Sequence, residues 1–286
     1  MNLMPLLDTQ SGPIISAQLK QFGKMHLLID PKINDDFFFT HQYQFESVIA
    51  IRDRQDTVSA DHQCLQLCTI NKTTSDLDQL IGELKDSDSA AIAIIFSSQS
   101  NNALQKHISN AMYMRYQGAD YLLRFYDPKV LKHLMAIFKP AQLSQLFGII
   151  EYWYYWDQHY IQLAHKPERV LSDINYQITA KQWQQLTIAQ SYNYYENLTI
   201  RQQKAVLSAE QQTTLQQLLD WAYRATYNQP DQRNLAVMVN YAMAQPAHFF
   251  VVINYDLFAQ CINDKTNDIE HYFAPLEKGI EHGITR

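Results

Sequence analysis

The sequence predicts a protein of the α+β or α/β class, with an N-terminal α/β lobe built on a central sheet and an α-helical C-terminal lobe. In the first half, short apolar runs typical of strands alternate with segments whose apolar residues recur at helical spacing. In the second half, these runs give way to helix-start sequences and helical periodicity. The pattern changes near Lys166 and Pro167, so we place the lobes at residues 1–166 and 167–286.

Five segments of the first lobe have the pattern of β-strands. They are short runs rich in apolar residues, and they cover residues 25–29, 47–51, 64–70, 90–96 and 121–126. The run at 90–96, AAIAIIF, is apolar throughout, which is typical of a strand buried on both faces. Between the strands, apolar residues at helical spacing predict helices over 75–84 and 102–114.

The segment 151–160, EYWYYWDQHY, is predicted to be a strand with bulky aromatic side chains on both faces. One interpretation is a core strand at the junction of the lobes. The other is an exposed aromatic surface for a protein partner, with Trp153, Tyr155 and Trp156 as the candidate binding residues.

The sequence RFYDP, residues 124–128, is predicted to be a corner between a strand and a helix. Aspartate is a favoured N-cap because its carboxylate accepts the free N–H groups of the first helical turn, which suits Asp127. Proline is favoured at the first helical position, which suits Pro128. Asp30 and Pro31 have the same form after their own strand. A further short helix is expected to begin at Pro140 and end at Gly148.

Arg124 is the charged residue of this corner that needs a partner. A guanidinium on a covered face requires a carboxylate or a carbonyl group nearby. The candidates are Asp30, Asp127 and Glu151. We favour a structural ion pair over a contact with a ligand.

The second lobe contains three sequences of the form S/T-x-x-Q, which is typical of a capping box at a helix start. They begin at Thr179, Thr199 and Ser208. Helical segments are also expected at 234–244 and 249–261, although the apolar run FFVVINY near 249–256 is also compatible with a strand.

Composition excludes several classes of function. The formal net charge of -6 and the lack of clustered Lys and Arg argue against a nucleic-acid-binding protein. The apolar runs are too short to cross a membrane, and the N-terminus lacks the features of a signal peptide. The seven glycines form no phosphate-binding loop, so we expect no nucleotide and no other cofactor. Three cysteines suit a reducing compartment, and we expect a cytoplasmic protein.

No catalytic or metal-binding motif is evident. His62, Cys64 and Cys68 lack the CxxC pairs and further ligands of zinc sites. Ser97 and Ser98 follow an apolar strand, but the surrounding sequence is not a nucleophile elbow, so a turn or a helix cap is expected. These observations favour a protein that is not an enzyme.

The sequence LLRFYDPKVLKHLMAIFKPAQLSQLFGII resembles the pattern of the effector-adaptor proteins of the bacterial type VI secretion system, the Tap- or Tec-type adaptor chaperones. HLLIDP resembles the early strand of that family, and AIAIIFSSQSNNALQKHI resembles its strand, polar turn and helix. The resemblance extends over residues 24–156. By residue, Arg124, Phe125, Tyr126, Asp127 and Pro128 match the central motif, and Asp30 and Pro31 the early one.

The resemblance implies a cytoplasmic adaptor that binds a secreted effector protein and helps to load it onto the VgrG spike protein. It implies no catalytic residues, so the motif residues are interpreted as determinants of the fold. Two other classes remain possible at this point. One is an immunity protein that neutralises a toxin, and the other is an enzyme with an unrecognised site near Arg124 and Asp127.

Overall fold

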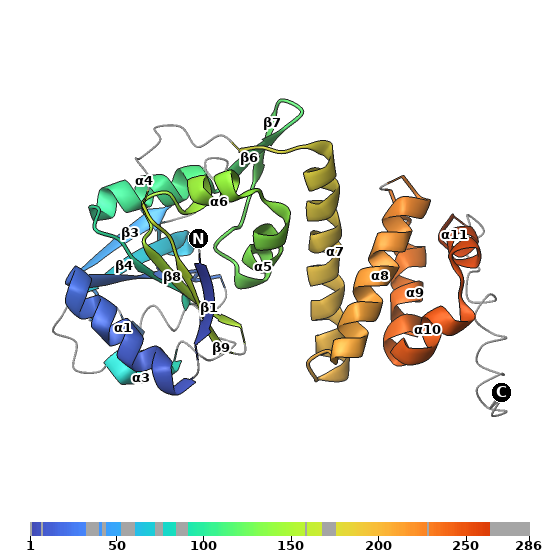
Figure 1. Ribbon diagram of the computed structural model, residues 1–286, viewed down its shortest axis with the longest axis horizontal. Coiled ribbons are helices and arrows are strands. Elements are labelled where there is room, and N and C mark those ends of the chain that lie inside the picture. Colours follow the sequence, from blue (N-terminus) through green and yellow to red (C-terminus); the bar gives the residue numbers. More distant parts are fainter. Residues whose placement is uncertain are drawn as a thin grey trace. The chain divides into compact units, whose positions relative to one another are not determined.

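A computed structural model describes residues 2–6, 8–32, 40–41, 44–52, 61–71, 77–83, 91–157, 159–167, 176–227 and 229–263 (Figure 1). The chain forms two compact units, Met1–Gln182 and Trp183–Arg286. The first unit contains the β-sheets, and the described part of the second unit is helical.

The first unit is built on an antiparallel sheet. Among the described residues it has seven strands in the order β1-β9-β8-β5-β2-β4-β3. Their bounds are β1 Asn2–Leu6, β2 Lys24–Ile29, β3 Ser47–Ile51, β4 Leu65–Asn71, β5 Ala91–Phe96, β8 Tyr152–Asp157 and β9 His159–Ala164. All neighbouring pairs in this sheet are antiparallel. The fold is therefore α+β, because an α/β fold requires a mainly parallel sheet.

A smaller sheet with the strand order β10-β6-β7 accompanies the large one. Strands β6, Tyr113–Tyr116, and β7, Ala119–Leu122, form an antiparallel hairpin. Strand β10, Tyr176–Gln177, pairs in parallel with β6. Because β10 returns to this sheet, the chain up to Gln182 belongs to the first unit, later than the lobe boundary expected at 166/167.

Helices cover both faces of the large sheet (Figure 1). Their bounds are α1 Asp8–Phe22, α3 Leu77–Glu83, α4 Asn101–Ala111, α5 Pro128–Ile137 and α6 Pro140–Phe147. Helices α1 and α3 pack on one face, where side chains such as Ile15 and Leu80 join Leu27, Ile94 and Tyr154 of the strands in one buried cluster. Helices α4, α5 and α6 lie on the other face. This arrangement explains why the run AIAIIF of β5 is apolar on both sides.

The four strands predicted between residues 25 and 96 are confirmed to within one residue at each end. Three other predictions need correction. The strand predicted at 121–126 ends at Leu122, and the segment 151–160 contains the whole of β8 and the start of β9, which pair as a hairpin. The helix predicted at 102–114 ends at Ala111, because Tyr113 already begins β6.

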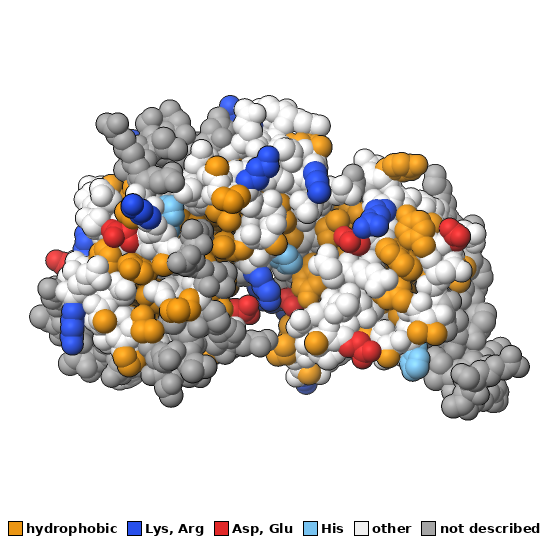
Figure 2. All heavy atoms as spheres, in the orientation of Figure 1, with side chains coloured by type: hydrophobic (Ala, Val, Ile, Leu, Met, Phe, Trp, Pro, Cys, Tyr) orange, Lys and Arg blue, Asp and Glu red, His pale blue; other side chains and the backbone are white. Residues whose placement is uncertain are grey.

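The second unit is a helical assembly whose first helix begins just before the division. The helices are α7 Ala180–Gln203, α8 Ala209–Ala225, α9 Gln232–Ala244, α10 Pro246–Val252 and α11 Tyr255–Asn263. Apolar side chains of these helices form one buried cluster that includes Leu215, Leu218, Met238 and Phe258. The region 249–256 is therefore mostly helical, with a break at Ile253 and Asn254. On the face shown in Figure 2, hydrophobic side chains are scattered over this unit, and several Lys, Arg, Asp and Glu side chains lie among them.

Two of the three predicted capping boxes are confirmed. Thr179 and Gln182 exchange side-chain to backbone hydrogen bonds at the start of α7, and Ser208 and Gln211 do so at the start of α8. The third is wrong, because Thr199 lies inside α7 and is buried. Within a helix each backbone N–H already binds the carbonyl four residues earlier, so no free donor remains to be capped.

Candidate functional site

The RFYDP sequence forms the corner between β7 and α5. The backbone N–H of Leu123 still donates to Met112 O, at 2.7 Å, as the base of the hairpin. The chain then turns, with Phe125 N donating to Leu123 O at 2.8 Å and Asp127 N donating to Arg124 O at 3.0 Å. These local bonds replace strand pairing, which is why the predicted strand stops before Arg124.

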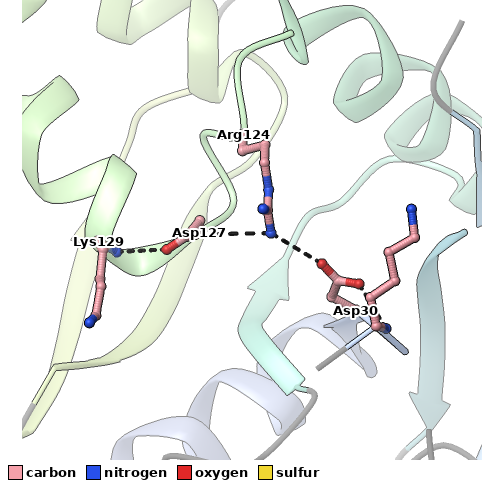
Figure 3. Close-up of polar contacts among 5 residues, drawn as sticks. Asp30, Arg124, Asp127 and Lys129 are labelled. Carbon is pink, nitrogen blue, oxygen red and sulfur yellow. Dashed lines mark hydrogen bonds and ion pairs between the residues drawn. The ribbon is translucent and has the colours of Figure 1, made fainter. Parts of the chain in front are cut away.

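Asp127 and Pro128 start α5 as predicted. Asp127 has extended backbone angles, and its Oδ1 accepts a hydrogen bond from the backbone N–H of Lys129 at 3.0 Å (Figure 3). Pro128 occupies the first position of the helix. The carboxylate therefore satisfies one of the N–H groups that the first turn leaves open, and the proline adds none.

Arg124 lies between two carboxylates. Figure 3 shows its guanidinium directed toward Asp30, at the end of β2, and toward Asp127. The Nη2 atom is 3.4 Å from Asp30 Oδ2 and 4.0 Å from Asp127 Oδ2. Asp30 is therefore the nearest of the three predicted partners, while Glu151 accepts a hydrogen bond from Ser98 N instead. The structural ion pair is present, although the Arg124 side chain is 48% exposed and the Asp30 side chain only 8%.

Asp30 has a second role at its own turn. Its Oδ1 accepts a hydrogen bond from the backbone N–H of Lys32 at 3.1 Å, and Pro31 and Lys32 form a turn. The expectation that Asp30 and Pro31 begin a helix falls on residues 33–39, which lie outside the described part of the chain.

The two aromatic residues of the motif are buried. The Phe125 ring is 0% exposed and lies 5.6 Å from the Trp153 ring, centroid to centroid. Both rings lie on the sheet face that α5 and α6 cover. The Arg124 guanidinium lies over the ring of Tyr126, with its carbon 5.6 Å from the centroid. Burial raises the pKa of Tyr126, Asp30 and Asp127 raise it further, and Arg124 opposes them, so the phenol is neutral at physiological pH.

The charged groups of the corner favour a fixed arrangement. Burial lowers the pKa of Arg124, but Tyr126, Asp127 and Asp30 together raise it by more, so the guanidinium remains charged. Each carboxylate is engaged by a backbone N–H group and lies near the same guanidinium. The half-exposed Arg124 is the charged group of the motif that a partner can reach most directly.

The three aromatic residues proposed for partner binding differ in exposure. Trp153 is 0% exposed and Tyr155 is 4% exposed, and burial raises the pKa of Tyr155 to about 12. Both side chains point to the sheet face covered by α5 and α6, where Trp153 also packs against Phe147. Direct contact with a partner is therefore open only to Trp156, which is partly exposed and packs against Tyr160.

A partly buried polar network that the sequence did not reveal lies where α4 meets the sheet. The side-chain amide of Asn101 donates to Ser47 Oγ at 2.9 Å and to Thr69 Oγ1 at 3.0 Å. Lys24 Nζ donates to Asn101 Oδ1 at 3.0 Å, and His26 Nδ1 lies 3.1 Å from Thr69 Oγ1. Burial, and to a smaller extent Lys24, lower the pKa of His26 to about 4. These residues come from four separate elements, so no spacing in the sequence could identify them.

Three of the remaining candidates for chemistry are Cys64, Cys68 and Ser97. Cys64 and Cys68 are buried, and burial raises the pKa of the Cys68 thiol to about 12. The hydroxyl of Ser97 donates to Ile149 O at 2.7 Å and accepts from Gln99 N, as expected for a turn. Within the described residues, no group of three or more His, Cys, Asp or Glu side chains is placed to hold a metal ion. No described helix combines the length and the apolar character needed to cross a membrane.

Residues 55–145 match a protein family described as Domain of unknown function (DUF4123). This domain is associated with type VI secretion effector adaptors. The match contains the β6–β7 hairpin, the RFYDP corner and the first part of α6, while Asp30 and the aromatic strand β8 lie outside it. Searches among curated proteins and among solved structures found no match.

Proposed function

We propose that this protein is a cytoplasmic adaptor chaperone that binds a type VI secretion effector and promotes its loading onto the VgrG spike. The observation that carries the proposal is the family match at residues 55–145, which contains the whole RFYDP motif. The early motif at Asp30 extends the resemblance, because Asp30 is the residue that pairs with Arg124 of the central motif.

The geometry of the corner agrees with a protein that acts by binding and not by catalysis. Arg124 links the end of β2 to the start of α5, Phe125 fills the core and Asp127 caps a helix. All these contacts stabilise one conformation of the segment that follows the β6–β7 hairpin. Each of the two carboxylates at the corner accepts a backbone N–H group on one oxygen and has the Arg124 guanidinium near the other.

The direct test is deletion of the gene in its own bacterium, followed by comparison of the secreted proteins. We expect one effector to be lost from the medium while the Hcp tube protein is still exported. Export of every effector at the normal level would contradict the proposal, and loss of Hcp export would indicate a core component of the secretion apparatus.

A second measurement separates an adaptor from an immunity protein. The effector identified by the deletion is expressed in a susceptible bacterium with and without this chain. We expect no protection of that cell by an adaptor, whereas an immunity protein would restore growth. Copurification of the effector, this chain and VgrG would then support the loading step.

A further inference from the structure

The β6–β7 hairpin carries an exposed outermost strand. Figure 1 shows the hairpin projecting from the first unit. All four residues of β7 are exposed, including the large apolar side chains of Tyr121, at 37%, and Leu122, at 38%. Two adjacent large apolar residues on an exposed edge strand are unusual, because such edges promote pairing with other chains.

The pairing pattern shows which backbone groups of β7 point outward. The hairpin turns through Gln117 and Gly118, both with positive φ, as in a two-residue type I′ turn. In an antiparallel pair, hydrogen-bonded and non-bonded residue pairs alternate. Met112 and Leu123 form a bonded pair, and Leu122 pairs with Tyr113 one position along. The N–H and C=O of Leu122 therefore point away from β6, toward the outer edge.

The edge is close to electrically neutral. Asp120 is the charged residue of β7, and Arg115 on the neighbouring strand holds it with two hydrogen bonds, of 2.8 and 3.2 Å. A charged peptide would therefore gain little electrostatic attraction from this pair of residues. The strand contains no proline, and its register with β6 has no bulge, so nothing within β7 itself prevents a further strand from pairing.

Strand β1 differs from β7 in this respect. In the large sheet, β1 is an edge strand and contains Pro5, which cannot donate a backbone hydrogen bond. The hairpin, in contrast, is anchored at its base by the RFYDP corner, because Arg124 and the buried Phe125 follow Leu122 almost directly. The corner therefore fixes the direction in which β7 is presented.

We propose that β7 binds an extended, uncharged segment of the secreted effector, which adds to the small sheet as a further strand beside β7. The backbone of Leu122 supplies the hydrogen bonds, and the side chains of Tyr121 and Leu122 contact apolar residues of that segment on the two faces of the sheet. This inference rests on the proposed function for the identity of the partner.

The test uses the exported protein whose secretion is lost in the deletion strain, in purified form. Leu122→Pro removes the outward N–H while leaving the bonds between β6 and β7 in place. Leu122→Thr is the matched control, because it shortens the side chain but keeps the N–H. We expect Leu122→Pro to weaken binding at least about tenfold and Leu122→Thr by no more than about threefold.

Amide hydrogen exchange of the wild-type protein gives an independent readout that does not depend on any variant folding. We expect the Leu122 amide to exchange slowly only in the complex. The Tyr121 amide, which faces β6, is expected to be protected with and without the effector. This alternation distinguishes a paired strand from a surface that is merely covered.

The outcomes separate the two proposals. Failure of wild-type protein to bind any exported protein would overturn the adaptor function itself. Normal binding by a folded Leu122→Pro variant, or an unchanged Leu122 amide in the complex, would overturn strand addition and leave the adaptor function standing. A Leu122→Pro variant that binds the effector fully but no longer binds VgrG would also overturn strand addition by the effector. The edge of β7 would then be the binding site for VgrG.

Discussion

Replacing Gly148 by alanine tests a close contact between the end of α6 and the His107 side chain of α4. Gly148 ends α6 with a φ of +43°, which residues with a side chain rarely adopt. A Cβ atom at this position would lie 2.3 Å from Cε1 and 3.0 Å from both ring nitrogens of His107. His107 cannot easily move, since it is 5% exposed and its Nε2–H donates to Leu146 O at 3.0 Å.

The expected cost has two parts. The unfavourable backbone conformation costs on the order of 1–3 kcal/mol. The overlap with a buried, hydrogen-bonded ring adds about 1–3 kcal/mol, as in other overpacked cores. We therefore expect Gly148→Ala to lower the free energy of unfolding by about 2–6 kcal/mol, measured by urea denaturation.

Two other glycines provide matched controls. Gly118 also has a positive φ, of +82°, but an added Cβ would meet no atom within 4 Å, so Gly118→Ala reports the backbone cost alone. Gly82 lies in α3 with open space around it, and Gly82→Ala should stabilise the helix by about 0.5–1 kcal/mol. In a His107→Ala background, the cost of Gly148→Ala should fall toward that of Gly118→Ala. Equal costs for Gly148→Ala and Gly118→Ala in the wild-type background would refute the steric argument.

Two further predictions concern buried polar groups. His26 has a pKa of about 4 in the folded protein against 6.5 as its ordinary value, so the unfolded chain binds more protons between these values, and stability falls as the pH drops from about 6.5 to 4. The loss is on the order of 3 kcal/mol, and unfolding of a His26→Leu variant should depend less on pH over this interval. Tyr154→Phe leaves the buried amide of Gln162 without the hydroxyl that accepts its hydrogen bond at 2.8 Å, which should cost about 1–3 kcal/mol. Tyr194→Phe, at a side chain that is 61% exposed, is the control and should be near neutral in thermal denaturation.

Local chemistry explains the parts of the fold that the sequence predicted correctly. The strand at 25–29, the cap at Asp127 and the capping box at Ser208 each depend on residues within a few positions of one another. Such features can be inferred from one sequence, because the atoms that stabilise them are close along the chain. Thr199 shows the limit, since the same four-residue pattern lies inside a helix when tertiary packing extends that helix.

Long-range partners could not be predicted in the same way. Arg124 had three plausible carboxylates, and the nearest is Asp30, 94 residues away, because β2 lies centrally in the sheet. The aromatic strand posed a related difficulty. The alternation of its side chains between the two faces is the same whether one face is exposed or both are covered. Only the placement of α5 and α6 shows that Trp153 and Tyr155 are buried.

The arrangement at the corner also changes the expected effect of mutating Arg124. For a fully buried pair, loss of one partner costs about 3–5 kcal/mol. Here the guanidinium is 48% exposed, and Asp30 keeps its hydrogen bond from Lys32 N. We therefore expect Arg124→Ala to cost on the order of 1–2 kcal/mol, between the values for exposed and buried pairs.

Variants of Arg124 and Asp127 test whether the corner is structural or binds the partner directly. Asp127→Ala removes the cap and should cost about 0.5–2 kcal/mol, while Asp127→Asn keeps a capping oxygen and should cost less. Arg124→Lys should restore the charge but not the planar group that lies over Tyr126, so rescue should be partial. The stability of each variant is measured by urea denaturation. Its affinity is measured separately, by titrating the folded protein with the effector. If the corner only positions the hairpin, affinity should decrease in the same order as stability. An Arg124→Ala protein that keeps its stability but loses the effector would instead make the exposed guanidinium a contact residue.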